Sequence, residues 1–119
     1  MVIGARKGFV KSAIEIVGYI LYSKDKTVLM TCPSAKKIES FNVPYGVLVI
    51  DKGAFEFHEE LTTLIMPQTV TKVERFAFFS CTNLSNVTFS KNLSVIEMSA
   101  FGSCDLSGLL TLPDSLTYL

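Results

Sequence analysis

Hydrophobic and polar positions along the chain repeat with a fixed period. The pairs Ala54-Phe55, Ala77-Phe78 and Ala100-Phe101 follow one another at intervals of 23 residues. Four further columns keep this phase: Pro44, Pro67 and Pro113; Val47, Val70, Leu93 and Leu116; Ile50, Val73, Ile96 and Leu119; and Val43, Met66, Phe89 and Leu112. A period of this length, kept at several positions, is the signature of a solenoid in which each copy forms one coil.

Each copy of the repeat divides into three segments. A short strand comes first, over 61–66 and 84–89, where alternate residues point to opposite faces. In two of the copies a proline ends the strand, because proline has no N–H to donate. A second segment has apolar residues three positions apart, such as Val70 and Val73. The Ala-Phe pair then predicts about one helical turn, in which stacked phenyl rings each bury about 150 to 250 Å².

The periodic part is preceded by a lead-in with a different pattern. We divide the chain into a lead-in of 1–40 and a repeat region of 41–119, which holds three repeats (41–64, 65–87 and 88–110) and a partial fourth. Within the lead-in, two β-prone runs at 13–22 and 27–30 flank a polar turn and predict a hairpin. We expect this hairpin to cap the first repeat, because a solenoid end exposes its core and unpaired backbone groups.

The residues of the second repeat carry a family resemblance. The run Val70-x-x-Val73-x-x-x-Ala77-Phe78-x-x-Cys81-x-x-Leu84-x-x-Val87-x-Phe89 resembles the BspA-type leucine-rich repeat, which occurs in surface proteins of bacteria and some protozoan parasites. The resemblance covers 41–119, with three departures: His58 replaces cysteine, Ser90 replaces proline, and Leu106 comes one place early. It implies a β-rich leucine-rich repeat solenoid, with short parallel strands on a concave face and one helical turn per repeat.

The resemblance also carries expectations about function. It implies a non-catalytic protein-binding or adhesion module that is displayed on a cell surface or secreted. The implied partner is a protein, such as a host or extracellular-matrix protein. The alternative is a structural spacer that stacks with further repeats, because a fold does not dictate a function.

Composition narrows the classes of partner. The 119 residues suggest one domain, and 49% of them are hydrophobic, which is enough for a core. Eleven basic residues balance 11 acidic ones, so no basic stripe predicts nucleic-acid binding. No apolar run approaches the roughly 20 residues that a membrane-spanning helix needs, and we recognise no signal peptide at the start. We therefore expect neither nucleic-acid binding nor membrane insertion.

The candidate binding site is the exposed side of the predicted strands. Its positions in three successive repeats are Thr63 and Ile65, Asn86 and Thr88, and Leu109 and Thr111. Solenoids commonly bind partners on such a surface. The alternative is that these residues form only a solvated sheet face.

Two columns contain residue types that can carry chemistry. Asp51, Glu74 and Glu97 form an acidic column, and we expect each side chain to cap the amides of the following Ala-Phe turn. In a second column His58 precedes Cys81 and Cys104, which we expect to remain free, buried thiols. A straight ladder cannot place four ligands tetrahedrally around zinc. We therefore predict no metal site, no cofactor and no enzymatic activity.

Two further features leave alternatives open. Asn83, Asn86 and Asn92 each begin an Asn-x-Ser/Thr triplet, which can accept a glycan in a eukaryotic secretory pathway or arise by chance from the repeat composition. The fourth repeat stops at Leu119 without an Ala-Phe turn. Either the chain is a fragment of a longer array, or this open coil associates end to end with another molecule.

Overall fold

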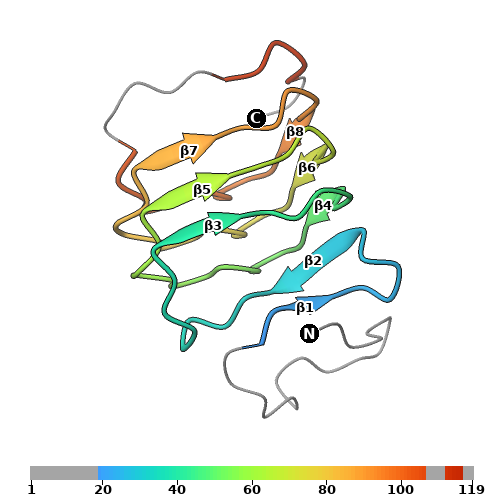
Figure 1. Cartoon of the computed structure of the whole chain (residues 1–119). Helices are drawn as coiled ribbons and strands as arrows, with labels where there is room; N and C mark the ends of the chain where they lie inside the picture. The colour runs from blue at the N-terminus through green and yellow to red at the C-terminus, as the bar shows by residue number, and fades with distance from the viewer. Residues whose placement is uncertain (1–18, 107–111, 117–119) are drawn as a thin grey trace.

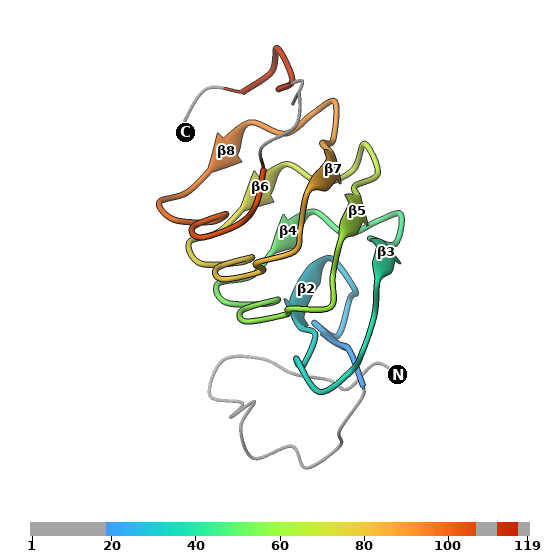
Figure 2. The same ribbon diagram turned by 90° about the vertical axis from the view of Figure 1, so that its left-hand side faces the viewer.

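The polypeptide winds into stacked coils that share one axis (Figure 1). The computed structural model describes residues 19–106 and 112–116. Their strands are β1 (Leu21–Tyr22), β2 (Val28–Thr31), β3 (Ser40–Asn42), β4 (Val49–Ile50), β5 (Thr63–Ile65), β6 (Lys72–Val73), β7 (Asn86–Thr88) and β8 (Val95–Ile96). These form two sheets, with strand orders β1-β2-β4-β6-β8 and β3-β5-β7. Figure 2 shows the two sheets as separate walls of the same coils.

The strands pair in the register that the period predicts. In the three-stranded sheet Thr63 pairs with Asn86 and Ile65 with Thr88, and all these strands run parallel. The same offset joins Val73 to Ile96 in the other sheet. The β-solenoid with 23-residue coils and parallel strands is therefore confirmed.

Each coil contributes a second strand that the sequence pattern did not predict. The segment with apolar residues three apart contains β4, β6 or β8 in successive coils, and each of these strands has two residues. A two-residue strand is too short to display the alternation by which strands are recognised. The solenoid consequently has two parallel walls rather than one.

The predicted hairpin caps one of these walls. β1 pairs antiparallel with β2, and β2 pairs parallel with β4, so that the hairpin takes the place of a preceding coil. Its turn is fixed by Asp25, whose Oδ1 accepts hydrogen bonds from the Ser23 hydroxyl at 2.8 Å and the Thr27 hydroxyl at 2.7 Å. The other wall differs, because no strand in 19–106 pairs with the outer edge of β3.

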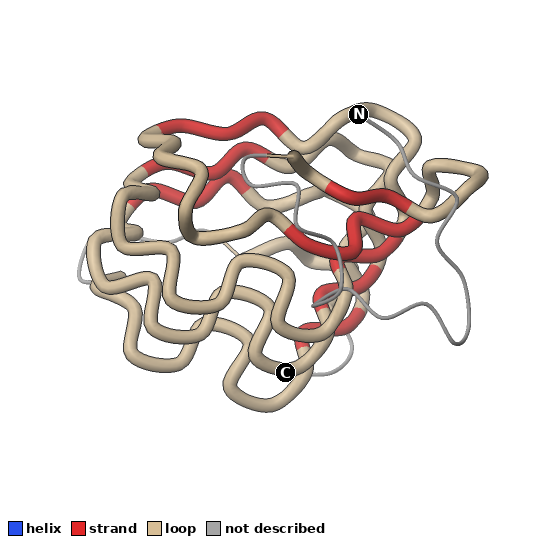
Figure 3. The backbone as a smooth tube through the Cα atoms, turned by 90° about the horizontal axis from the view of Figure 1, so that it is seen from below, coloured by secondary structure: helices blue, strands red, loops and turns tan. Residues whose placement is uncertain are grey.

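The Ala-Phe segment consists of consecutive hydrogen-bonded turns and contains no regular helix. The N–H of Ala54 donates to the carbonyl of Asp51, and that of Ala77 to Glu74, each bond spanning three residues. Residues with positive φ, such as Phe57 at 60° and Ser80 at 59°, interrupt any helical run. Figure 3 accordingly shows only strands and loops in the described part of the chain.

Phenylalanine rings form the centre of the core. Phe55 and Phe78 stack with ring centroids 4.9 Å apart, and Phe78 and Phe101 stack at 5.1 Å with an interplanar angle of 6°. Ala54 and Ala77 are buried beside them, so neighbouring coils can approach closely. Burying one such ring stabilises the fold by about 1.5–3 kcal/mol. This column therefore holds successive coils in register.

The fourth repeat begins in the same register. The N–H of Leu116 donates to the carbonyl of Pro113, which reproduces the turn that Val70 makes with Pro67. The Ser115 hydroxyl donates to the Lys91 carbonyl at 2.7 Å, which ties this turn to the coil before it.

Candidate functional site

The exposed side of β3, β5 and β7 carries the candidate binding residues. Ile65, Asn86 and Thr88 are exposed and Thr63 is half-buried, while Leu109 and Thr111 lie outside the described residues. The in-register pairs Thr63–Asn86 and Ile65–Thr88 place these four side chains on one surface. The structure thus brings together four of the six predicted positions.

Sequence reasoning missed one strand of this surface. Ser40 and Asn42 are exposed on β3 and pair with Thr63 and Ile65. The signal was present, because Ser40 and Asn42 lie 23 residues before Thr63 and Ile65. We call the surface formed by Ser40, Asn42, Thr63, Ile65, Asn86 and Thr88 the β3–β5–β7 face.

The β3–β5–β7 face is uncharged. Five of its six side chains are hydroxyls or amides, and the sixth, Ile65, is 40% exposed near its centre. Such a surface can donate and accept hydrogen bonds and can bury one aliphatic side chain. It contains no group that titrates near neutral pH, so it offers no general acid or base.

The three asparagine triplets differ in their surroundings. The amide of Asn83 donates to the Glu59 carbonyl, and that of Asn92 to the Gln68 carbonyl, both at 2.8 Å. These two side chains tie one coil to the coil before it. Asn86 instead lies exposed on the β3–β5–β7 face. A modification of Asn83 or Asn92 would therefore cost an inter-coil hydrogen bond, whereas one at Asn86 would not.

The acidic column is compensated within the coils. Lys72 Nζ lies 3.4 Å from Glu74 and 3.5 Å from Glu97, so it bridges two carboxylates. Glu97 also accepts the backbone N–H of Arg75 at 3.1 Å, and Asp51 accepts that of Lys52 at 2.8 Å. The expectation that each carboxylate caps its own Ala-Phe turn was wrong in detail, because backbone carbonyls accept the alanine amides.

Partial burial, and then the neighbouring Asp51, raise the pKa of Glu74 above its ordinary value. The ammonium of Lys72 acts in the opposite direction. The column therefore behaves as a structural network whose members share one lysine.

The thiol column is buried, as predicted. Cys81 is fully buried and Cys104 half-buried, and both are free thiols. Each Sγ donates to a backbone carbonyl of the coil before it, Cys81 to Phe55 at 3.0 Å and Cys104 to Phe78 at 3.1 Å. A thiol that donates in this way stays protonated and unreactive, because the thiolate is the nucleophile.

His58 occupies this column in the first coil and is fully buried. Its Nε2 lies 3.5 Å from Cys32 Sγ, and its Nδ1 has no hydrogen-bond partner. Burial lowers the pKa of His58 below its ordinary value, and the Lys37 charge acts in the same direction. The Pro33 carbonyl and Glu60 favour the charged ring, but no hydrogen bond of ordinary geometry joins that carbonyl to Nδ1. Burial also raises the pKa of the Cys32 thiol to about 12, so the pair is uncharged at neutral pH.

Two other kinds of site were sought. Within 19–106 and 112–116, no three His, Cys, Asp or Glu side chains gather closely enough to hold a metal ion. Over the same part of the chain, no helix has the length and apolarity to cross a bilayer.

The stacked coils, their internal asparagine and cysteine hydrogen bonds, and the exposed strand face define a leucine-rich repeat solenoid. The family model described as "BspA type Leucine rich repeat region (6 copies)" matches residues 28–119. The chain belongs to this family. Its members are typically non-catalytic, and the leucine-rich repeat fold is generally a protein-binding scaffold.

Solved structures with the same fold come from several bacteria. The pneumococcal vaccine antigen PcpA is 30% identical, with a TM-score of 0.76, over 83% of this chain and 24% of its own. A leucine-rich repeat protein from Bacteroides capillosus is 26% identical, with a TM-score of 0.70, over 87% of this chain and 84% of its own. The T. pallidum leucine-rich repeat protein TpLRR, at 22% identity and a TM-score of 0.72 over 84% of this chain and 49% of its own, shows the fold alone.

This chain therefore spans about a quarter of the length of PcpA. Comparison with curated proteins gives no match.

Proposed function

We propose that this chain is a non-catalytic protein-binding module of a surface or secreted leucine-rich repeat protein, and that it binds through the β3–β5–β7 face. The observation that carries the proposal is the flat, uncharged array of exposed side chains on this face, with Ile65 near its centre. Protein interfaces typically combine a small apolar centre with polar groups at the rim. The 30% identity to a pneumococcal vaccine antigen supports display outside the cell.

The chemistry of the face defines the kind of partner. Because the six positions carry no charge, binding depends on hydrogen bonds and on shape more than on long-range attraction. We therefore expect an uncharged patch on a host or extracellular-matrix protein, with affinity that changes little between low and high salt.

Surface plasmon resonance against purified fibronectin, laminin and collagen tests this proposal. We expect the wild-type chain to bind at least one of these proteins, and Asn86→Asp with Thr88→Asp to weaken that binding by about tenfold or more, because two buried carboxylates would lack partners. The matched control is Ser34→Asp with Ala35→Asp, which adds the same charge at exposed loop positions. Equal affinity of all three proteins, or no binding to any of the three probes, would exclude the face as proposed.

A structural spacer is the second candidate, favoured by the turn at 113–116, which stacks in register on the third coil. A spacer would tolerate single substitutions anywhere on its surface. A compact group of damaging positions centred on Asn86 and Thr88 would favour the binding module instead.

A further inference from the structure

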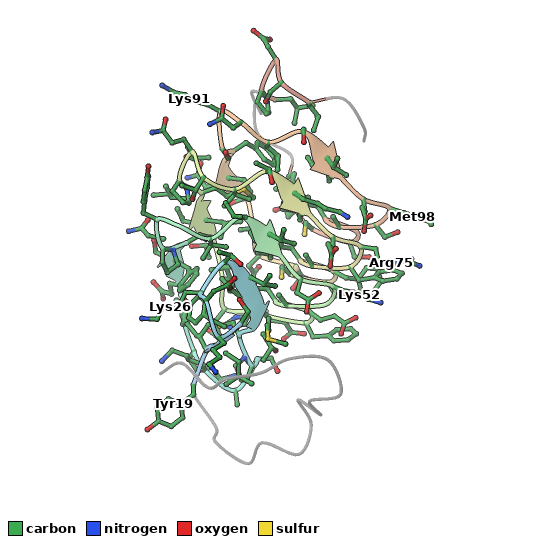
Figure 4. The ribbon with its side chains drawn as sticks, turned by 90° about the vertical axis from the view of Figure 1, so that its right-hand side faces the viewer. Tyr19, Lys26, Lys52, Arg75, Lys91 and Met98 are labelled. Carbon is green, nitrogen blue, oxygen red and sulfur yellow. The ribbon has the colours of Figure 1, made fainter. Side chains whose placement is uncertain are left out.

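A second exposed surface lies on the edge formed by the Ala-Phe turns. It consists of Phe57, Phe76, Phe79 and Met98 with the cationic side chains of Lys52 and Arg75, and we call it the turn-edge patch. Figure 4 shows Lys52, Arg75 and Met98 one above another along this edge, on the opposite side of the molecule from Lys26 and Lys91. Neither the polar β3–β5–β7 face nor the core uses these residues.

The aromatic rings of the turn-edge patch form a cluster. The Phe79 ring meets Phe57 edge to face, with centroids 6.0 Å apart, and meets Phe76 in the same way at 5.4 Å. Gly102 leaves room for this arrangement, since a Cβ at that position would lie 2.8 Å from the Phe79 ring. Phe57 is nevertheless 55% exposed and Met98 66% exposed. The cluster is preformed and presents apolar surface to solvent.

Two of the rings occupy backbone positions that disfavour large side chains. Phe76 has φ of 59° and shares its column with Gly53 and Ser99. Phe57 has φ of 60° and shares its column with Ser80 and Ser103. A left-handed conformation costs free energy for any residue with a Cβ. Neither backbone preference nor burial therefore explains why phenylalanine stands at these two positions.

The charges around the patch favour an acidic partner. Lys52 and Arg75 are exposed, and no ion pair joins either of them to an acid within the described ranges. The nearby acids Glu74 and Glu97 are held by Lys72. One further carboxylate, that of Glu56, lies over Gly53, so two cations face one anion. Exposed phenylalanine, methionine and arginine are also the residue types that are enriched at protein interfaces.

We propose that the turn-edge patch docks an acidic segment of a partner protein. An apolar side chain of that segment packs against the rings of Phe57 and Phe76, and its carboxylates lie against Lys52 and Arg75. This surface is separate from the β3–β5–β7 face, so each proposal can fail without the other.

An NMR titration tests the docking surface. The probe is a short synthetic peptide in which Asp alternates with Leu, and the controls are a Lys-Leu peptide and an Asp-Ser peptide of equal length. We expect the Asp-Leu peptide to shift the signals of the Phe57, Phe79 and Met98 side chains, with binding about tenfold tighter than that of either control. Shifts confined to Ser40, Thr63 and Asn86, equal binding of the three peptides, or no shift at saturating peptide would overturn the proposal.

Residues taken from neighbouring coils supply the matched variants. Phe57→Ser and Phe76→Gly introduce what the same columns carry in other coils, so we expect the double variant to keep a Tm at least as high as that of wild type and to lose the peptide-induced shifts. Asn86→Asp with Thr88→Asp should leave those shifts unchanged. A lowered Tm with unchanged peptide affinity would show that the rings only support the turns. Equal recruitment of wild type and the double variant to phosphatidylserine vesicles, without any response to the peptide, would also overturn the proposal.

Discussion

The imidazole of His58 lies against the thiol of Cys32, with Nε2 and Sγ 3.5 Å apart, and the two side chains exchange the sizes that their columns have elsewhere. Cys32 precedes Phe55 by 23 residues, and its N–H donates to the Ala54 carbonyl as that of Phe55 donates to Ala77. His58 precedes Cys81 by the same interval, and its ring centroid lies 5.8 Å from that of Phe55. A small residue in the phenyl column is thus balanced by a ring in the thiol column.

This pair makes stability depend on pH. Because burial lowers the pKa of His58 below its ordinary 6.5, the folded state binds fewer protons than the unfolded state. The contribution of the neutral ring is present above that ordinary value and is lost as the pH falls toward the lowered pKa. We expect the Tm of wild type to fall between pH 7.5 and pH 5, about the range in which histidine titrates.

His58→Cys is the matched variant, since it introduces the residue of the neighbouring coils. It should be less stable at pH 7.5, because it leaves a cavity, but it should lose less stability than wild type as the pH falls. Thermal melting at both pH values measures this difference. Parallel pH dependence in the two proteins would show that His58 does not titrate on unfolding.

The phenyl column should show graded sensitivity to truncation. Phe78 is fully buried between two rings, whereas Phe101 is half-buried. We expect Phe78→Ala to lower the free energy of unfolding by about 3–5 kcal/mol, because it leaves a large cavity. Phe101→Ala should cost clearly less, and urea unfolding of both variants provides the comparison. Equal losses would mean that the rings do not differ in burial as the structure shows.

The asparagine ladder should contribute where it bonds and nowhere else. Asn92→Ala removes a hydrogen bond of 2.8 Å to the Gln68 carbonyl and should lower stability by about 0.5–1.5 kcal/mol. Asn86→Ala removes an exposed side chain and should change stability by less than about 0.5 kcal/mol. Urea midpoints of the two variants test the contrast, and a larger loss for Asn86→Ala would reverse the assignment.

The acidic column should be relieved by removing one charge. Burial and Asp51 raise the pKa of Glu74 above its ordinary 4.5, so the folded state favours protonated Glu74, and this stabilisation is lost as the pH rises through the raised pKa. Glu74→Gln mimics the protonated side chain, and we expect it to match or exceed wild type in stability at pH 7. That advantage should vanish below the ordinary pKa of Glu74, and chemical denaturation at both pH values would reveal it. Lower stability of the variant at pH 7 would show that the ion pair with Lys72 dominates.

The period of the sequence predicted the fold because stacking puts equivalent residues directly over one another. Phe55 and Phe78 appear in the chain as a repeated Ala-Phe pair and in the structure as a stacked pair of rings. The second wall of strands escaped prediction, since Lys72–Val73 is too short to show alternation. The size exchange between Cys32 and His58 also escaped, because Cys32 lies in a loop before the first recognised repeat and its column was not assigned.

The candidate site was predicted only in part. The alternation around Leu64 located Thr63 and Ile65, and the same reasoning one coil earlier would have found Ser40 and Asn42. The turn-edge patch gave no periodic signal, because Phe57 and Phe76 stand where other coils have serine or glycine. Departures from a repeat reveal a surface only after the backbone shows that they are neither buried nor conformationally favoured.

The account depends on coils that stack in register around the phenyl column. Aromatic NOE spectroscopy on protein with selectively labelled phenylalanine measures this directly. The structure predicts cross-peaks between the rings of Phe55 and Phe78, whose centroids are 4.9 Å apart, and between Phe78 and Phe101, at 5.1 Å. Ring protons of Phe78 that contact neither Phe55 nor Phe101 would contradict the stacked coils and the positions of both proposed binding surfaces.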